Sequence, residues 1–278
     1  MPTPILVIGS SSFLAKEFIL SFSHYFTIYT ASRRPGSGLL IDLSNYSYLP
    51  ELCFPQFPEF AIIFASEVST SYCEKNPSAS FQVNCRATCK LVSDLNAVGI
   101  KCIFPSSTAV FNHQALCNSE ISLAEPSCVY GHQKLFVEKQ ILQNPFNGVI
   151  RFTKVFSLKS RLLHSWRTQL LQNCPIDAFD DLHVAPLHPE FVVDYFRQMI
   201  LNPQTGVFHL SPSAHLTYFQ MALRLSQVLN VSKDLVRPVS SFVKLSPDAY
   251  RPQKAFLDVK KLFSRSIPLE LCLDIIFN

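Results

Sequence analysis

PILVIGSSSFLA, residues 4–15, is the stretch of sequence that decides the fold. An apolar run leads into Gly9, a serine-rich turn follows, and a segment with helical spacing of apolar residues begins directly after the turn. A strand that passes through a glycine turn into a helix presents backbone N–H groups to a phosphate at the helix N-terminus. We therefore predict a strand at 4–9, a helix at about 12–22, and a phosphate-binding turn formed by Gly9, Ser11, Ser12, Phe13 and Leu14. Taken alone, this stretch would equally fit an ordinary polar turn between a strand and a helix.

The same pattern of apolar runs and helical segments continues through the first half of the chain. Further strands are predicted at 26–32, 60–66, 101–107 and 147–153, and further helices at 77–98 and 129–143. Such alternation is typical of an α/β, Rossmann-type, doubly wound parallel sheet with helices on both faces. Beyond residue 153 prolines separate shorter elements. We predict a dinucleotide-binding domain at 1–153, with part of the C-terminal region returning to it, and a smaller α/β substrate-binding lobe mainly at 154–278.

Composition narrows the class of protein. The 278 residues are 48% hydrophobic and 16% charged, which indicates a globular chain and also allows a homodimer. Nine cysteines without a C-x-x-C pair favour buried thiols in a reducing compartment. We expect a cytoplasmic protein without a membrane segment, because there is no basic apolar leader and no run of 18 apolar residues. The net charge of +4 contains no basic block, so nucleic acid is not expected as a partner.

Tyr130 and Lys134 are the strongest catalytic candidates. They are four residues apart in the predicted helix 129–143, so they lie on one face, one turn apart. A tyrosine with a pKa near 10 is a poor acid–base group at neutral pH, and a neighbouring ammonium favours its phenolate. Ser106, Ser107 and Thr108 offer hydroxyls at the end of the preceding strand. Alone, such a pair occurs by chance in many proteins and fits an amphipathic helix with an exposed lysine better than a catalytic site.

Together these motifs resemble extended short-chain dehydrogenases/reductases that act on nucleotide sugars, especially the dTDP-4-dehydrorhamnose reductase family. The resemblance rests on GSSSFLA (9–15), CEKNPSASFQVN (73–84), SSTAVF (106–111), YGHQK (130–134), VIRFTKVFS (149–157), GVFHLSP (206–212) and RPQKAFLD (251–258). It implies a catalytic triad of Ser107, Tyr130 and Lys134, with Ser107 placed by counting back from Val110-Phe111. It also implies that Lys134 holds the nicotinamide ribose and that Asn84 supports the site, although an asparagine on a helix face can be merely structural.

The resemblance also implies where a cofactor would bind. Against the family pattern G-x-x-G-x-x-G, Gly9 is kept, whereas Ser12 and Ala15 replace the second and third glycines. Ser12 places a Cβ where the backbone would approach a phosphate. Arg33 and Arg34 follow the second strand, where arginine accommodates a 2′-phosphate, so NADP(H) is favoured over NAD(H). Otherwise they are solvated surface arginines. The resemblance places Asp42 and Leu43 at the adenine, and Ala65 and Ser66 beside the dinucleotide.

Several residues are candidates for binding substrate. They are Thr108, Lys154, Trp166, His183 and Arg251, of which Arg251 matches the diphosphate-facing arginine of the family. His183 and His188 fit equally well as polar residues of a proline-bearing loop. No metal site is expected, because Asp180, Asp181 and His183 have no established ligand spacing.

Three functions remain open at this point. The first is NADPH-dependent reduction of a nucleotide-linked 4-keto-deoxysugar for polysaccharide or glycolipid biosynthesis. The second is an epimerase that retains NAD. The third is a non-catalytic regulatory subunit that binds NADP or a nucleotide sugar. Dehydration is disfavoured, because Thr108-Ala109 lacks the Asp-Glu pair of the related dehydratases.

Overall fold

The structure is a computed structural model that describes residues 2–34, 36, 38–112, 114, 118–245 and 249–278. Cys117, one of the nine cysteines, lies outside the described residues. The chain divides into two compact units. Unit 1 comprises Met1–Val110, Ala124–Arg151 and Glu190–Phe208, and unit 2 comprises Phe111–Leu123, Phe152–Pro189 and His209–Asn278. Phe111–Leu123 thus belongs to unit 2, and the later segment Glu190–Phe208 belongs to unit 1.

A mostly parallel sheet of eight strands forms the framework, and it confirms the predicted doubly wound fold. Its strands are β1 (Pro4–Ile8), β2 (Thr27–Ser32), β3 (Leu39–Leu40), β4 (Phe60–Ile63), β5 (Lys101–Ser107), β6 (Gly148–Phe152), β9 (Gly206–Pro212) and β12 (Arg265–Ile267). Their order is β12-β9-β6-β5-β4-β1-β2-β3. β1 pairs in parallel with both β2 and β4, so the chain winds outward from β1 in two directions. This reversal of strand order places the ends of β1 and β4 next to each other.

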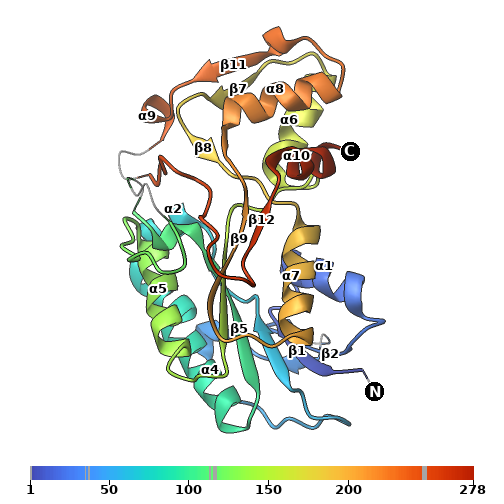
Figure 1. Cartoon of the computed structure of the whole chain (residues 1–278), viewed down its shortest axis with the longest axis vertical. Helices are drawn as coiled ribbons and strands as arrows, with labels where there is room; N and C mark the ends of the chain where they lie inside the picture. Colours follow the sequence, from blue (N-terminus) through green and yellow to red (C-terminus); the bar gives the residue numbers. More distant parts are fainter. Residues whose placement is uncertain (1, 35, 37, 113, 115–117, 246–248) are drawn as a thin grey trace. The chain divides into compact units, whose positions relative to one another are not determined.

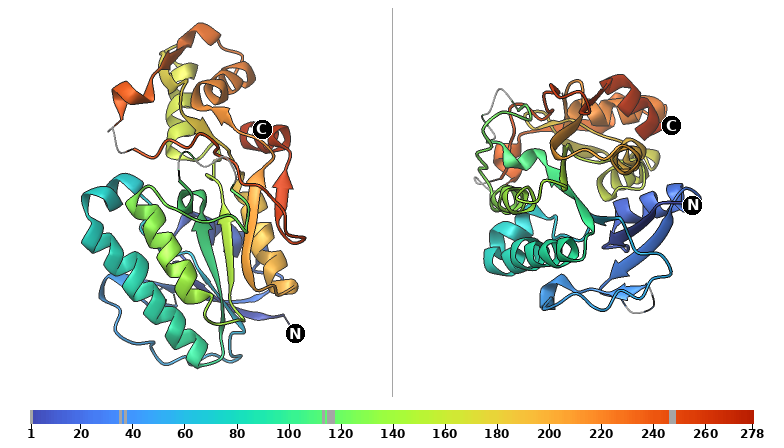
Figure 2. Two further views of the ribbon diagram at one scale, coloured as in Figure 1. Left: turned by 60° about the vertical axis from the view of Figure 1, so that its left-hand side comes forward. Right: turned by 60° about the horizontal axis from the view of Figure 1, so that its bottom comes forward.

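Helices cover both faces of the sheet in unit 1 (Figure 1). They are α1 (Phe13–Phe22), α2 (Thr70–Lys75), α3 (Pro77–Phe81), the π-helical η2 (Gln82–Ala87), α4 (Thr88–Ala97), α5 (Val129–Ile141) and α7 (Pro189–Leu201), with short turns η1 (Leu43–Asn45) and η3 (Thr108–Val110). α4 and α5 lie side by side on one face, and α1 and α7 cover the other (Figure 2).

The buried sides of α4 and α5 explain why they dock on the sheet. Leu91 and Leu95 of α4 and Val137 of α5 are fully buried in one apolar cluster with Leu6 and Phe104 of the strands. Two predictions differ from what is observed in this unit. The predicted helix 77–98 contains the π-helical η2, and the predicted strand 60–66 ends at Ile63, so that Ala65 and Ser66 lie in a loop.

Unit 2 has an apolar core of its own. Its elements are α6 (Arg161–Leu171), β7 (Ile176–Phe179), β8 (His183–Val184), β10 (Leu216–Thr217), α8 (Tyr218–Val228), η4 (Lys233–Leu235), β11 (Val236–Val239), α9 (Ser241–Lys244) and α10 (Leu269–Phe277). β11 pairs in parallel with β7, and β10 pairs in antiparallel fashion with β8. Leu163 and Leu170 of α6 pack in this core with Met221 and Leu225 of α8. No helix among the described residues is long and apolar enough to cross a membrane.

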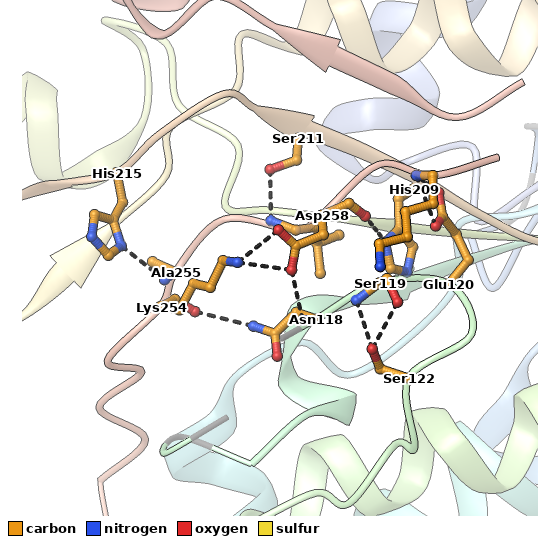
Figure 3. A network of polar contacts seen from close by, with 12 residues as sticks. Asn118, Ser119, Glu120, Ser122, His209, Ser211, His215, Lys254, Ala255 and Asp258 are labelled. Atoms are coloured by element: carbon orange, nitrogen blue, oxygen red, sulfur yellow. Dashed lines mark hydrogen bonds and ion pairs between the residues drawn. The ribbon is translucent and has the colours of Figure 1, made fainter. Parts of the chain in front are cut away.

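A polar network explains why Phe111–Leu123 belongs to unit 2 (Figure 3). The backbone N–H of Asn118 donates to Asp258 at 2.9 Å, and Asp258 forms an ion pair with Lys254 at 2.7 Å. Glu120 is buried and accepts hydrogen bonds from the backbone N–H of Lys260 at 3.2 and 3.1 Å. Because these partners lie 140 residues apart in sequence, Asn118 and Glu120 are held by the C-terminal part of the chain.

Candidate functional site

The turn between β1 and α1 requires its glycine. Gly9 has a φ of +81°, and a Cβ at this position would lie 2.5 Å from the backbone nitrogen of Ala65. Both restrictions exclude other residues, since φ is in the left-handed region and the loop after β4 approaches the turn closely. Ala65 in turn donates from its backbone N–H to the carbonyl of Ile8 at 3.1 Å. Gly9 and Ala65 are thus brought together, as two of the predicted cofactor residues.

Ser12 occupies the N-cap position of α1. Its backbone is extended, but its side chain accepts no hydrogen bond from the first turn of the helix. Its hydroxyl is instead buried without a hydrogen-bond partner, so it does not project from the turn into solvent. The first-turn N–H groups of a helix carry partial positive charge and lack intrahelical acceptors. Ala15 is buried in place of a glycine, and the first turn of α1 has no side-chain cap, an arrangement typical of anion sites at helix N-termini.

Two arginines follow β2, as the sequence indicates. Arg33 and Arg34 are exposed, and the backbone N–H of Arg34 donates to the hydroxyl of Ser32 at 3.0 Å. Asp42 caps η1 by accepting from the backbone and hydroxyl of Ser44, and these bonds, with the charge of Arg33, lower the pKa of Asp42. Leu43 lies in the buried core of unit 1 and not on its surface. A basic surface therefore stands at the end of the second strand.

Asn84 has a larger role than its sequence context indicates. It is buried in η2, and its side-chain carbonyl accepts from the Ser66 hydroxyl at 3.0 Å and from the Glu67 backbone at 2.7 Å. Its amide donates to the Glu67 carbonyl at 2.9 Å and to the Gln133 side chain on α5 at 2.8 Å. Single π-helical turns commonly mark functional sites. Here the turn carries the residue that joins the loop after β4 to the helix with the catalytic candidates.

Tyr130 and Lys134 are both buried on the same side of α5. The Lys134 ammonium donates to the carbonyl of Pro105 at 2.9 Å, and it lies 4.5 Å from the ring centre of Phe104 and 5.6 Å from that of Tyr130. Burial lowers the pKa of Lys134 to about 8 and raises the pKa of Tyr130 above its usual value near 10. At neutral pH the pair therefore consists of a phenol that holds its proton and an adjacent ammonium.

Gly131 brings this helix against the segment with the candidate hydroxyls. Ser107 ends β5, and its hydroxyl accepts from the backbone N–H of Ala109 at 3.2 Å. A Cβ on Gly131 would overlap the carbonyl oxygen of Ala109 and lie 2.8 Å from its carbonyl carbon. Sequence reasoning missed this glycine, although its place directly after Tyr130 was the available signal. Ser107 and Thr108, which begins η3, thus lie on a segment that α5 touches.

The remaining predicted substrate residues all belong to unit 2. Lys154 is exposed, with its ammonium 5.8 Å from the ring centres of both Phe156 and Tyr218. Trp166 is only 6% exposed and packs edge-on against Tyr218, with ring centres 6.5 Å apart. Its observed role is core packing, so the prediction that Trp166 contacts substrate is not supported by its burial. A large aromatic residue at helical spacing more often has this role.

His183 and Arg251 lie in separate surroundings within unit 2. His183 stacks on His215 with ring centres 4.5 Å apart. Arg251 donates to the hydroxyl and carbonyl of Ser241 at 3.1 and 3.2 Å and to the carbonyl of Ala249 at 3.1 Å. These contacts hold the guanidinium against the start of α9 and against Ala249. Among the described residues, no group of three or more His, Cys, Asp or Glu side chains could hold a metal ion.

The doubly wound sheet, the glycine turn before α1 and the Tyr–Lys helix beside β5 define the architecture of extended short-chain dehydrogenases/reductases. Within this class, the chain belongs to the RmlD substrate binding domain family, which matches residues 3–270.

Two solved structures share the fold, and a curated protein is similar in sequence; the three have different names and activities. The dTDP-4-dehydrorhamnose reductase of Bacillus anthracis, in complex with NADP, superposes with a TM-score of 0.86 at 17% identity and covers 100% of this chain and 99% of its own. The UDP-glucose 4-epimerase of Thermotoga maritima, with UDP-glucose, gives 0.76 at 15% identity, covering 99% and 97%. Methionine adenosyltransferase 2 subunit beta of Mus musculus is 25% identical over 279 residues, covering 93% of this chain and 81% of that protein.

Proposed function

We propose that the chain binds NADP(H) in unit 1 and reduces the carbonyl of a nucleotide-linked 4-keto-deoxysugar. The observation that carries the proposal is the placement of Tyr130 and Lys134 on one side of α5, in contact with the strand end that bears Ser107. The likeness to the NADP-bound Bacillus reductase supports the choice of cofactor, and the epimerase with UDP-glucose supports a nucleotide sugar as substrate.

Each residue of the proposed triad has a part that its surroundings support. When bound, NADPH supplies the hydride that the carbonyl carbon accepts. Tyr130 gives its proton to the carbonyl oxygen, and its raised pKa keeps that proton available at neutral pH. Ser107 uses its hydroxyl to donate a hydrogen bond to the same oxygen, while its own oxygen accepts from Ala109. Lys134 places a positive charge beside the phenol, which stabilises the phenolate left after proton transfer.

NADP(H) is the expected cofactor and NAD(H) the less favoured one. Arg33 and Arg34 are exposed at the end of β2, where a 2′-phosphate would need cations. We expect the protein to act in the cytoplasm, which is supported by the eight described cysteines being free thiols. A substrate of this class implies a product that enters polysaccharide or glycolipid biosynthesis. That the protein forms a homodimer stays a prediction.

A second candidate function is a non-catalytic subunit that binds NADP or a nucleotide sugar and regulates a partner. It is favoured by the likeness to a beta subunit of methionine adenosyltransferase 2. The replacement of two family glycines by Ser12 and Ala15 supports it as well, because a protein that does not turn over a cofactor would tolerate weaker cofactor binding. An NAD-retaining epimerase has less support, since Arg33 and Arg34 do not suit NAD.

One experiment separates these functions. NADPH and NADH binding is titrated by fluorescence, and NADPH oxidation is then followed with a panel of nucleotide-linked 4-keto sugars. The reductase predicts binding and turnover in the wild type, and binding without turnover in Tyr130→Phe. His132→Ala is the matched control, because His132 is exposed on the same helix turn. Cofactor binding without turnover of any sugar would favour the subunit, and tightly retained NAD without net reduction would favour the epimerase.

A further inference from the structure

A buried charge cluster lies one helical turn beyond Lys134. Glu138 continues the four-residue spacing of Tyr130 and Lys134, so all three side chains occupy one side of α5. Glu138 is 1% exposed, and its carboxylate forms an ion pair with Arg151 of β6 at 2.6 Å. A second guanidinium nitrogen of Arg151 donates to both carboxylate oxygens at 3.0 and 3.2 Å. The Ser106 hydroxyl donates to the same carboxylate.

This cluster completes a series of contacts around Ser107. Going along the chain, Lys134 binds the carbonyl of Pro105, Glu138 binds the hydroxyl of Ser106, and Gly131 abuts the carbonyl of Ala109. The helix with the proposed proton donor thus holds the backbone on both sides of Ser107. Positioning of this kind matters because a reacting group displaced by about 1 Å can lose about 100-fold in rate.

The cluster also determines the charge that Lys134 experiences. The titratable groups that face its ammonium are Tyr130 and Glu138 on α5, Cys85 on η2 and Cys73 on α2. Burial raises the pKa of Tyr130 and of both thiols, to about 12 for Cys85, so all three are neutral at physiological pH. The carboxylate of Glu138 forms its ion pair with the Arg151 guanidinium. Of the groups acting on Lys134, Glu138 therefore supplies the negative charge that offsets the cost of burying an ammonium.

Stability alone is a weak reason for such a pair. Burying two charges carries a desolvation penalty that their attraction often only balances, and apolar residues of similar volume serve a core equally well. Glu138 contacts Ser106, the residue before Ser107, and lies one helical turn from Lys134. A charged Glu138–Arg151 pair at this place can act on the candidate catalytic residues, which an apolar pair could not do.

We propose that Glu138, fixed by Arg151, is a positioning residue that sets the place of Ser107 through Ser106 and keeps Lys134 an ammonium. The proposal rests on the function proposed above, in which Ser107 and Lys134 serve the reaction. Its electrostatic part is a property of the protein without substrate, so it is measured separately from activity.

The first test follows the titration of Lys134 in the Glu138→Gln variant. Protein labelled with ¹³C at the lysine Cε is titrated by NMR, and Lys134→Arg assigns the signal. Loss of the neighbouring carboxylate moves the Lys134 titration to lower pH by about 1 pH unit. The protonated fraction at pH 8 then falls from about one half to about one tenth. Glu125→Gln is the control, because Glu125 is exposed in the loop before α5.

Glu138→Gln leaves Arg151 buried without its carboxylate, which destabilises the fold. A double variant, Glu138→Gln with Arg151→Met, removes both charges and is expected to regain most of that stability. If Glu138 has the proposed role, Lys134 in the folded double variant still titrates at a lower pH than in the wild type. Its kcat is expected to fall about 10-fold or more, with little change in KM. Recovery of the wild-type titration in the folded double variant overturns the proposal, and so does failure of both variants to fold.

Failure of the proposed function gives a different result. If the wild type oxidises no NADPH with any sugar, the reductase is rejected, while the Lys134 titration still decides whether Glu138 keeps this lysine charged. If the wild type is active and Glu138→Gln leaves the Lys134 titration unchanged, the positioning role is rejected and the reductase stands.

Discussion

Gly131→Ala is the substitution that most sharply tests the contact between α5 and the Ser107 segment. In an ordinary helix interior, replacing glycine by alanine stabilises the fold by about 0.5–1 kcal/mol, because the backbone loses less entropy on folding. At Gly131 the new methyl group would overlap the Ala109 carbonyl oxygen and lie 3.0 Å from the Cβ of Pro126. Overpacking of a dense interior costs about 1–3 kcal/mol. We expect a net loss of about 1–2 kcal/mol, since the overlap involves backbone that cannot rotate away.

The effect on activity should exceed the effect on stability. The overlap moves α5 away from Ala109, and it moves Tyr130 away from Ser107 as well. A displacement of Tyr130 by about 1 Å should lower kcat about 100-fold. Urea denaturation gives the free energy of unfolding, and NADPH oxidation gives kcat. His132→Ala, at the exposed neighbouring position, should change neither. A Gly131→Ala variant that is more stable than the wild type, with unchanged turnover, would refute the close contact.

Three further predictions follow from the same site. Since Lys134 has a pKa of about 8, NADPH affinity should fall as the pH rises through 8 and the ammonium is lost. Lys134→Arg should flatten this pH profile in a fluorescence titration, because arginine stays charged. If the Lys134→Arg variant still loses affinity at alkaline pH, Lys134 is not the titrating group. Asn84→Leu leaves the Glu67 backbone N–H without its acceptor and should cost about 1–3 kcal/mol in urea denaturation; an unchanged midpoint would contradict this. Replacing Arg33 and Arg34 by alanine should weaken NADPH binding about 10-fold or more and leave NADH binding unchanged; equal loss for both cofactors would show that they do not read the 2′-phosphate.

The strands and helices around the first turn could be predicted because local residue pattern decides them. A run such as Ile5–Ile8 suits only a strand buried on both faces, and Gly9 marks the turn that follows it. The spacing of Tyr130 and Lys134 fixed their common helix face for the same reason. The π-helical turn at Gln82–Ala87 was not predictable, since π and α turns use the same residue types.

Features that depend on contacts between residues far apart in the chain could not be predicted from the sequence. Phe111–Leu123 joins unit 2 through Asn118 and Asp258, whose pairing no local pattern encodes. Trp166 offers an aromatic ring equally suited to a substrate or a core, and only packing against Tyr218 decides between them. Glu138 looks like an ordinary helix glutamate until β6 places Arg151 beside it.

The central claim is that Tyr130 donates the proton in an NADPH-dependent reduction. It is tested most directly by NADPH oxidation with nucleotide-linked 4-keto sugars, measured for the wild type and for Tyr130→Phe after NADPH binding has been shown for both. The reductase predicts turnover by the wild type with at least one sugar, and its loss in Tyr130→Phe at unchanged NADPH affinity. Equal turnover by both proteins, or bound NADPH that no sugar consumes, would contradict the claim.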